Sequence, residues 1–214
     1  MRVVLIWLVR LNFRLSKNGN EKSFLHTMKN IAIFASGSGT NAAAIMDNFM
    51  GHPEIFVSLT ATNNPEAGVI EKAEERVVPV TVFENEDLND EEYMLELLRG
   101  IDLIVLAGFL KKIPSYLVNE FEGRIVNIHP ALLPKYGGKG MYGDKVHQAV
   151  IENGEKESGI SIHLVNENYD DGDVLFQDTV PVSQQDTPDT LALKVRKLEH
   201  EHYPEVIEKL VRSL

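Results

Sequence analysis

The sequence predicts an open α/β fold, because short apolar runs alternate with longer amphipathic ones from residue 30 onward. This alternation is typical of βαβ units, in which helices join mainly parallel strands. The apolar runs predict strands at 30–35, 55–61, 78–83, 103–107, 124–128, 159–165 and 174–182. The amphipathic segments predict helices near 40–50, 65–75, 91–99, 114–120 and 143–153, and a last helix within 187–212.

Two local signals refine this expectation near the C-terminus. Residues 166–173 form a connection too short for a parallel crossover, so the strands on either side should pair antiparallel. The predicted fold is therefore a mixed, mostly parallel seven-stranded sheet flanked by helices. At 186–189, Asp-Thr-Pro-Asp suits a helix N-cap followed by proline in the first turn.

Length and composition favour one domain. The chain has 214 residues, 43 % of them hydrophobic, which is enough for one substantial core. Its net charge of -11 disfavours general nucleic-acid binding, and the absence of cysteine excludes disulfides and thiolate chemistry. We therefore expect a cytoplasmic monomer or homodimer without nucleic-acid or membrane partners.

Residues 1–27 differ in character from the rest of the chain. The apolar run at 3–9 is far shorter than the roughly 20 residues that span a bilayer. No small-residue cleavage site of a secretory signal follows it cleanly. Because Met28 leads directly into the first expected strand, we expect residues 1–27 to be a non-core extension and residues 28–214 to form the functional domain.

The strand expected at 124–128 ends in a polar pair. Asn127 and His129 are two residues apart, so their side chains should point the same way at the C-terminal end of the strand. Open α/β sheets bind ligands at that end. An amide and an imidazole beside one carbonyl can stabilise the oxyanion of a tetrahedral intermediate. Pro130 and Pro134 make the following chain rigid, which favours a reaction centre over a capping asparagine and a core histidine.

A glycine-rich turn, Ser-Gly-Ser-Gly-Thr-Asn at 36–41, joins the first strand to the first helix. Its backbone N–H groups and the helix N-terminus can cradle a phosphate. The loose dinucleotide pattern G-x-G-x-x-A is present, but 61–64 reads Ala-Thr-Asn-Asn where a dinucleotide enzyme carries an acidic residue. A single sugar phosphate is therefore favoured, and a tight turn without a ligand is the alternative.

Two further candidates lie in or before the 166–173 loop. Asp170 is suited to accept a proton, directly or through water, and the neighbouring Asp171 would raise its pKa if close. The loop does not match an EF-hand, because its glycine falls at the seventh position instead of the sixth.

His163, on the strand before the loop, either orients the centre or packs locally. His200 and His202 diverge on a helix, make no metal site, and are expected at the surface.

The turn at 36–41, the segment at 124–134 and the 166–173 loop, in this order, resemble the folate-dependent formyltransferases, most closely the phosphoribosylglycinamide formyltransferase family. The likeness runs from about residue 28 to residue 212. It implies a Rossmann-like formyltransferase fold. It also implies transfer of the formyl group of the cosubstrate 10-formyltetrahydrofolate to the amine of phosphoribosylglycinamide in purine biosynthesis, with no metal.

The resemblance also implies residue roles. It makes Asn127, His129 and Asp170 catalytic, and His163 a supporting residue. It assigns phosphoribosylglycinamide binding to Gly39, Thr40, Asn41 and Glu199, and folate binding to Leu110, Lys111, Lys112, Ile113 and Asn127.

The sequence departs from the family pattern at two places. The family has two glycines after its catalytic aspartate, where this chain has Asp171 and Gly172. Residues 84–92 are acidic where some relatives offer an arginine to folate, which leaves the contacts of the glutamate tail open. The alternatives are methionyl-tRNA formyltransferase, which normally adds a tRNA-binding domain, formyltetrahydrofolate hydrolase, which normally adds a regulatory domain, and a non-catalytic sugar-phosphate binding protein.

Overall fold

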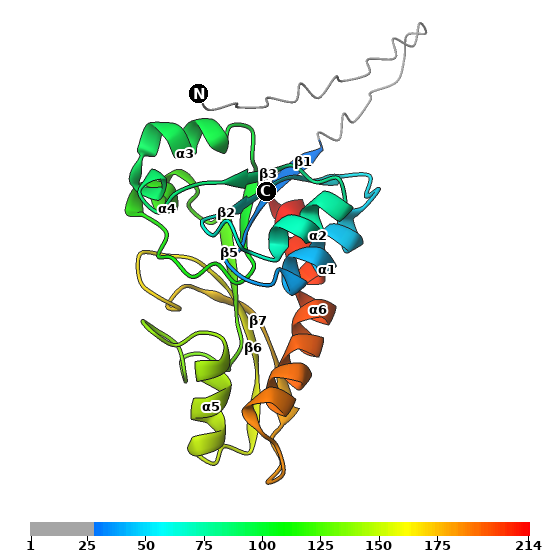
Figure 1. Ribbon diagram of the computed structural model, residues 1–214, viewed down its shortest axis with the longest axis vertical. Helices are drawn as coiled ribbons and strands as arrows, with labels where there is room; N and C mark the ends of the chain where they lie inside the picture. The colour runs from blue at the N-terminus through cyan, green and yellow to red at the C-terminus, as the bar shows by residue number, and fades with distance from the viewer. Residues whose placement is uncertain (1–27) are drawn as a thin grey trace, which may run out of the picture.

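A computed structural model describes residues 28–214, which form a seven-stranded sheet with helices on both faces (Figure 1). The strands are β1 (Lys29–Phe34), β2 (Ile55–Thr62), β3 (Val80–Val82), β4 (Leu103–Leu106), β5 (Ile125–His129), β6 (Glu157–Leu164) and β7 (Val174–Pro181). The helices are α1 (Thr40–Phe49), α2 (Val69–Glu75), α3 (Glu91–Leu97), α4 (Ser115–Glu120), α5 (Asp144–Glu152) and α6 (Pro188–Ser213), with a short 3-10 helix η1 (Asp87–Asn89). The expected α/β class is confirmed.

The strand order is β3-β2-β1-β4-β5-β6-β7, and the neighbouring pairs from β3 to β5 are parallel. β6 and β7 pair antiparallel, as the short connection between them predicted. β6 is also antiparallel to β5, so the mixed part of the sheet is wider than expected. The sequence did not reveal this second reversal, because α5 lies between the two strands and a helical connection is typical of a parallel crossover. The strand order reverses between β1 and β4, which creates a switch point there.

The sheet is buried between two apolar layers, which explains its continuous apolar runs. Strand β1 shows the alternation directly, since Ile31 and Ile33 pack toward α1, α2 and α6, whereas Ala32 and Phe34 pack toward α3 and α4. Phe34 also meets Phe109 edge to face, with ring centroids 5.4 Å apart. Burial of each large apolar side chain contributes about 1.5–3 kcal/mol, so both layers hold the ends of the central strands in place.

Helix α6 fixes two neighbouring strands. Thr187 caps its N-terminus and Pro188 is its first residue, which confirms the cap expected from the sequence. The fully buried Tyr203 directs its hydroxyl between the carbonyls of Leu106 on β4 and Val126 on β5, each 3.0 Å away. The helix continues through Pro204 without interruption. One buried phenol therefore ties α6 to the two strands that lead into the cavity described below.

Some local features differ from expectation. Helix α2 begins at Val69 instead of near residue 65, because the side-chain oxygen of Asn64 accepts a hydrogen bond from the Glu66 N–H at 3.0 Å and holds a turn there. The expectation from sequence did not include η1. His202, expected at the surface, is half-buried and lies 2.9 Å from Asp178 on β7.

The expectation that residues 1–27 form a non-core extension lies outside the described residues. Among the described residues, those that build the two apolar layers lie between 31 and 211. From residue 28 to residue 214, no helix combines the length and the apolar composition that crossing a membrane requires.

Candidate active site

The C-terminal ends of the central strands border a cavity of about 550 Å3. Ligands bind at this place in open α/β sheets, beside the switch point in the strand order. The walls come from turn 37–41, segments 106–113 and 127–130, loop 138–144, residues between 163 and 170, and one face of α6. The cavity brings together every site residue that the sequence analysis singled out.

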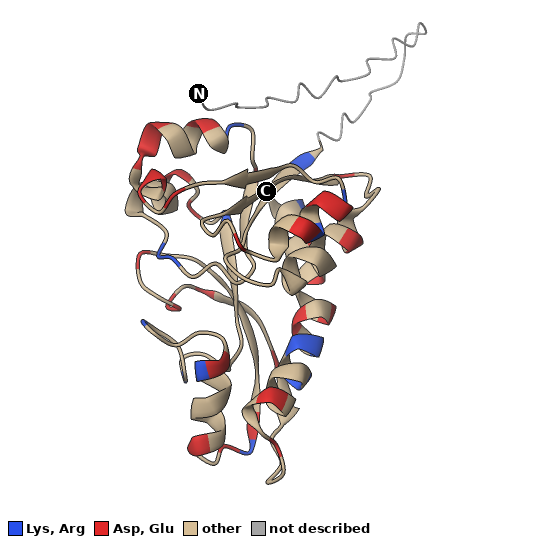
Figure 2. Ribbon diagram, viewed as in Figure 1, with Lys and Arg blue, Asp and Glu red and all other residues tan. Residues whose placement is uncertain are grey.

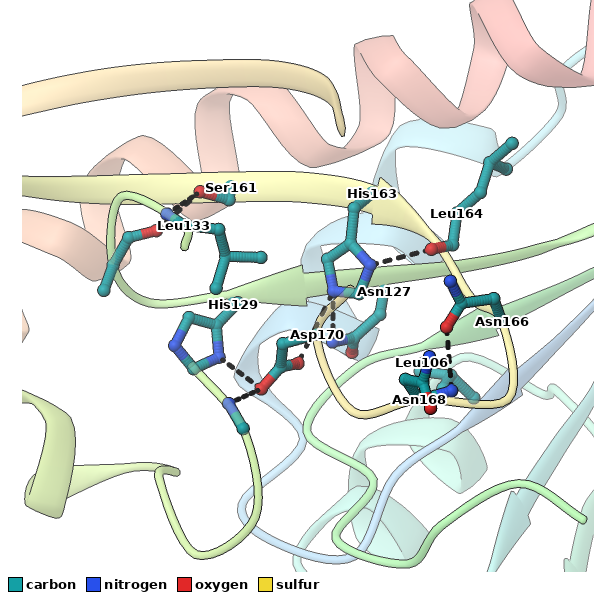
Figure 3. A network of polar contacts seen from close by, with 12 residues as sticks. Leu106, Asn127, His129, Leu133, Ser161, His163, Leu164, Asn166, Asn168 and Asp170 are labelled. Atoms are coloured by element: carbon teal, nitrogen blue, oxygen red, sulfur yellow. Dashed lines mark hydrogen bonds and ion pairs between the residues drawn. The ribbon is translucent and has the colours of Figure 1, made fainter. Parts of the chain in front are cut away.

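Asn127 and His163 face each other across the antiparallel β5–β6 pair (Figure 3). The Nδ2 of Asn127 lies 3.1 Å from the Nε2 of His163, and the Nδ1 of His163 lies 2.8 Å from the Leu164 carbonyl oxygen. Because a carbonyl only accepts, Nδ1 carries the ring proton and Nε2 accepts from the Asn127 amide. This contact holds the Asn127 amide and supports the orienting role of His163, one of the two roles that the sequence analysis left open.

His129 lies two residues further along β5, and its side chain is directed toward the same centre (Figure 3). The imidazole is 3 % exposed, and its Nε2 donates to the Tyr136 carbonyl at 2.7 Å. Its Nδ1 lies 3.6 Å from the Oδ2 of Asp170, too far for a hydrogen bond. Burial lowers the pKa of His129, although Asp170 and the Tyr136 carbonyl oppose this shift. The ring is therefore neutral at neutral pH, and Nδ1 is able to take up a proton.

Asp170 lies between the two histidines. Its Oδ1 is 3.6 Å from the Nε2 of His163, and its Oδ2 accepts a hydrogen bond from the Gly138 N–H at 2.8 Å. Burial raises the pKa of Asp170, but the proximity of His163 and His129 and the hydrogen bond from the Gly138 N–H together outweigh burial and lower it. The carboxylate is therefore ionised at neutral pH and able to accept a proton.

The two residues after Asp170 explain the departure from the family pattern. Asp171 is exposed and accepts a hydrogen bond from Asn168 at 3.0 Å, and the pKa of Asp170 is lowered instead of raised. The concern that Asp171 raises the pKa of the site is therefore not supported. At Gly172 a Cβ would lie 1.8 Å from the Leu164 carbonyl oxygen. The backbone therefore requires glycine at position 172 and accepts aspartate at position 171.

The segment after β5 is held by hydrogen bonds between its backbone and side chains on β6 and β7. The Leu133 N–H donates to the Ser161 hydroxyl at 2.9 Å (Figure 3), and Gln177 donates to the Leu133 carbonyl at 3.1 Å. Tyr136 then adopts a left-handed φ of 57°, and its carbonyl meets His129. Loop 138–144 follows at once, so the same stretch of chain contacts both His129 and Asp170.

The glycine-rich turn brings the N-terminus of α1 to the cavity wall. Gly39 has a φ of 73°, and a Cβ there would lie 2.6 Å from the Cα of Val69, so glycine is required. The side chains of Asn63 and Asn64 hold the turn, since the Ser36 hydroxyl donates to Asn63 at 2.7 Å and Asn64 donates to the Ser36 carbonyl at 3.1 Å. These amides occupy the place of the ribose-binding acid of dinucleotide enzymes, so the turn suits a single phosphate.

Helix α6 adds two charged residues to this end of the cavity. Glu199 accepts a hydrogen bond from the Nδ2 of Asn41 at 3.0 Å, which joins two residues that the resemblance assigned to acceptor binding. Burial raises the pKa of Glu199, while Asn41 and Arg196 oppose the shift. Arg196 also lines the cavity. Sequence reasoning missed it, because its only signal was the three-residue spacing from Glu199 on one helix face.

Segment 106–113 forms another wall. Ile113 is buried and Leu110 is 52 % exposed. The Leu110 N–H donates to the Ser36 hydroxyl at 3.0 Å, so that backbone group is already paired. The ammonium of Lys112 lies 6.0 Å from the ring centre of Tyr169. Acidic residues are prominent on the helices of the molecule (Figure 2), so the exposed Lys111 and Lys112 form a local cationic rim on a chain of net charge -11.

A buried histidine on α5 is a second cavity residue that sequence reasoning missed. His147 lines the cavity and is 6 % exposed. In the sequence it stands in an amphipathic helix, where a single histidine has no distinguishing signal. Among residues 28–214, no group of three or more histidine, aspartate or glutamate side chains is arranged to hold a metal ion.

An oriented amide, a neutral imidazole able to take a proton, and an ionised carboxylate surround one cavity at the sheet switch point. This combination defines a centre for group transfer from a carbonyl donor, because it can stabilise an oxyanion and move a proton. The chain belongs to the formyl transferase family, whose sequence model matches residues 29–207.

Relatives and solved structures agree with this assignment. The chain is 45 % identical over 187 residues to the chloroplastic phosphoribosylglycinamide formyltransferase of Arabidopsis thaliana, covering 84 % of this chain and 64 % of that protein, which is less than two thirds of its length. It is 36 % identical to the phosphoribosylglycinamide formyltransferase of Bacillus subtilis, covering 86 % and 95 % of the two chains. The crystal structure of glycinamide ribonucleotide transformylase 1 from Geobacillus kaustophilus superposes with a TM-score of 0.78 at 38 % identity, over 86 % and 99 % of the chains.

Proposed function

We propose that the protein transfers the formyl group of 10-formyltetrahydrofolate to the glycyl amine of phosphoribosylglycinamide, a step of purine biosynthesis. The observation that carries this proposal is the convergence of Asn127, His129 and Asp170 on one cavity, with His163 and Gly138 holding their side chains. The family membership and the names of the relatives support it. A cavity of about 550 Å3 suits small-molecule substrates.

Asn127 and His129 have complementary tasks at the formyl oxygen. One N–H of the Asn127 amide is held by His163, which leaves its second N–H to donate to an oxyanion. His129 can donate through Nδ1 only after that nitrogen gains a proton, because its Nε2 proton is held by Tyr136. We infer that His129 Nδ1 gains the proton that Asp170 takes from the attacking amine. The imidazolium then forms as negative charge develops on the formyl oxygen, and the two charges stabilise each other.

Asp170 handles the proton that the reaction releases. The amine nitrogen forms a bond to the formyl carbon and must lose one proton, and N10 of the folate must gain one when its bond to that carbon breaks. Ionised Asp170 accepts the amine proton, directly or through water. The Nδ1 of His129, 3.6 Å away, offers a route by which a proton reaches the leaving nitrogen. One proton is removed and one delivered, so the transfer is balanced.

The remaining walls divide between the two substrates. We assign the phosphate of the acceptor to the turn residues Gly39, Thr40 and Asn41 together with Arg196, and its ribose to Glu199. The folate lies along the wall formed by Leu110, Lys111, Lys112 and Ile113. The cationic rim of Lys111 and Lys112 is suited to the carboxylates of the folate tail, because residues 84–92 offer no cation there.

A deformylation assay tests this proposal. The protein is incubated with 10-formyltetrahydrofolate alone, with phosphoribosylglycinamide, or with methionyl-tRNA, and the loss of the formyl group is followed by absorbance. We expect turnover only with phosphoribosylglycinamide. Equal turnover without an acceptor would identify a hydrolase, and turnover with methionyl-tRNA would identify the other transferase. Binding of phosphoribosylglycinamide without any turnover would identify a non-catalytic binding protein.

A further inference from the structure

Two residues that line the cavity each carry a buried polar atom without a hydrogen-bond partner. In the described part of the chain, the buried side-chain atoms without a partner are Asn41 Oδ1, Thr60 Oγ1, His147 Nδ1 and Ser158 Oγ. Of these four residues, Asn41 and His147 line the cavity. A buried polar group without a partner lowers stability, so such atoms are rare unless a ligand or water completes them.

His147 comes from α5, a helix to which the mechanism above assigns no role. Its side chain is 6 % exposed, and α5 packs directly on α6, the helix that carries Arg196 and Glu199. Burial lowers the pKa of His147; Asp144 opposes this shift, and Arg196 and His129 add to it. The imidazole therefore lies within electrostatic range of both the polar end of the cavity and the reaction centre.

The chemistry at this end of the cavity selects the ligand. A neutral imidazole offers one N–H donor and one acceptor nitrogen, and it adds no charge of its own. The same cavity is lined by Arg196, which carries a guanidinium, by Glu199, which carries a carboxyl group, and by Asn41, whose buried amide oxygen is unpaired. A phosphorylated sugar carries both anionic oxygens and hydroxyl groups, and so can satisfy all of these groups together.

We propose that His147 is a positioning residue that hydrogen-bonds the ribose phosphate of the acceptor and thereby aligns the acceptor amine with His129. This inference rests on the proposed function. It adds a third helix, α5, to the acceptor site, beside the N-terminus of α1 and the face of α6. Because His147 touches the ribose phosphate and not the reacting atoms, it should affect acceptor affinity much more than the chemical step.

The competing explanation is that His147 is only a packing residue, and the two explanations predict opposite effects on stability. A packing histidine should leave a destabilised protein when it is replaced. A ligand-binding histidine that is unpaired in the free protein should be replaceable by an apolar side chain of similar size with no loss of stability, because the unpaired Nδ1 disappears.

The experiment compares His147→Leu and His147→Gln with the intact chain. His200→Leu is the matched control, because His200 is an exposed histidine on α6 that does not line the cavity. Calorimetric titration gives the Kd for phosphoribosylglycinamide and, separately, for tetrahydrofolate, and thermal unfolding without ligand gives the midpoint. Ribose 5-phosphate and inorganic phosphate are titrated as smaller probes of the same contact.

We expect His147→Leu to weaken phosphoribosylglycinamide binding about tenfold, the loss of one hydrogen bond to a charged or polar group. Tetrahydrofolate binding should change less than about twofold, the unfolding midpoint should not fall, and His147→Gln should recover part of the affinity. A weakened ribose 5-phosphate titration with unchanged inorganic phosphate would place the contact on the sugar, and weakening of both would place it on the phosphate.

Unchanged acceptor affinity in both His147 variants, with the intact chain still binding phosphoribosylglycinamide, would overturn this inference and leave the proposed function standing. A lower midpoint together with equal weakening of both ligands would show that His147 is a packing residue and would also overturn it. If the intact chain binds no phosphoribosylglycinamide at all, the proposed function fails and the inference fails with it.

Discussion

Replacement of Asp170 by asparagine tests the proton-transfer assignment most directly. The substitution preserves the shape of the side chain but removes its ability to take a proton at neutral pH. We expect kcat to fall about 100-fold or more, the usual contribution of a positioned acid–base group, which corresponds to about 2.7 kcal/mol in the activation barrier. The KM for both substrates should change little.

The contacts of Asp170 explain why binding should survive. The oxygen of an asparagine can still accept the hydrogen bond from Gly138, which is 2.8 Å long in the structure. Its nitrogen would then face the Nε2 of His163, which already accepts from Asn127 at 3.1 Å. The variant therefore keeps the fold of the 166–173 loop and loses the negative charge and the proton acceptor.

The assay is steady-state deformylation of 10-formyltetrahydrofolate with phosphoribosylglycinamide as the acceptor, combined with direct titration of each substrate. Asp171→Asn is the matched control, because Asp171 is the adjacent residue, is exposed, and does not line the cavity. A kcat within about threefold of the intact protein in Asp170→Asn would refute the proton-transfer role. An equal loss in both variants would show that the loop, and not the Asp170 carboxylate, was disturbed.

The remaining predictions concern stability and acceptor binding. The pKa of Asp170 is lowered in the fold, so its ionisation stabilises the protein above the unfolded pKa of about 4, and this contribution is lost as pH falls through the lower folded value. Urea titrations should therefore show the stability difference between the intact protein and Asp170→Asn shrinking toward about pH 2, and a constant difference would contradict the shift. Gly172→Ala should lower the unfolding midpoint by about 5 °C or more, because its Cβ would meet the Leu164 carbonyl at 1.8 Å, whereas Gly37→Ala, with nothing within 4 Å, should not. Arg196→Gln should raise the KM for phosphoribosylglycinamide about tenfold and make it less sensitive to salt, and an unchanged KM would remove Arg196 from the acceptor site. A chain that starts at Met28 should unfold within about 3 °C of the full chain, and a larger fall in calorimetry would show that residues 1–27 contribute to the fold.

The architecture was predictable because parallel strands are buried on both faces. All four residues of β4 are buried, and the sequence shows them as one apolar run. The pairing of Asn127 with His129 followed from the two-residue period of a strand, which depends only on local geometry. The N-cap of α6 was predictable for the same reason, since its signal lies within 186–189.

Long-range register was not predictable from local patterns. His163 orients Asn127 because β5 and β6 run antiparallel with these two residues paired, and the intervening helix hid that reversal. The Tyr136 carbonyl and the Gly138 N–H hold His129 and Asp170, yet backbone groups are identical at every residue and carry no sequence signal. Arg196 and His147 reach the cavity because of how α6 and α5 pack in the fold. The sequence of each helix alone does not show this packing.

Helix α6 also has a consequence for the order in which the candidate site is completed during synthesis. A chain emerges N-terminus first, so the glycine-rich turn, the strands and the Asn127–His129 pair all exist before residues 188–213 are made. Those late residues supply the Arg196 and Glu199 side chains of the acceptor end, and the Tyr203 hydroxyl that joins the ends of β4 and β5. Under the proposed function, a nascent or prematurely terminated chain that lacks α6 has the groups for chemistry without the groups assigned to the acceptor. We therefore expect no turnover before the fold is complete.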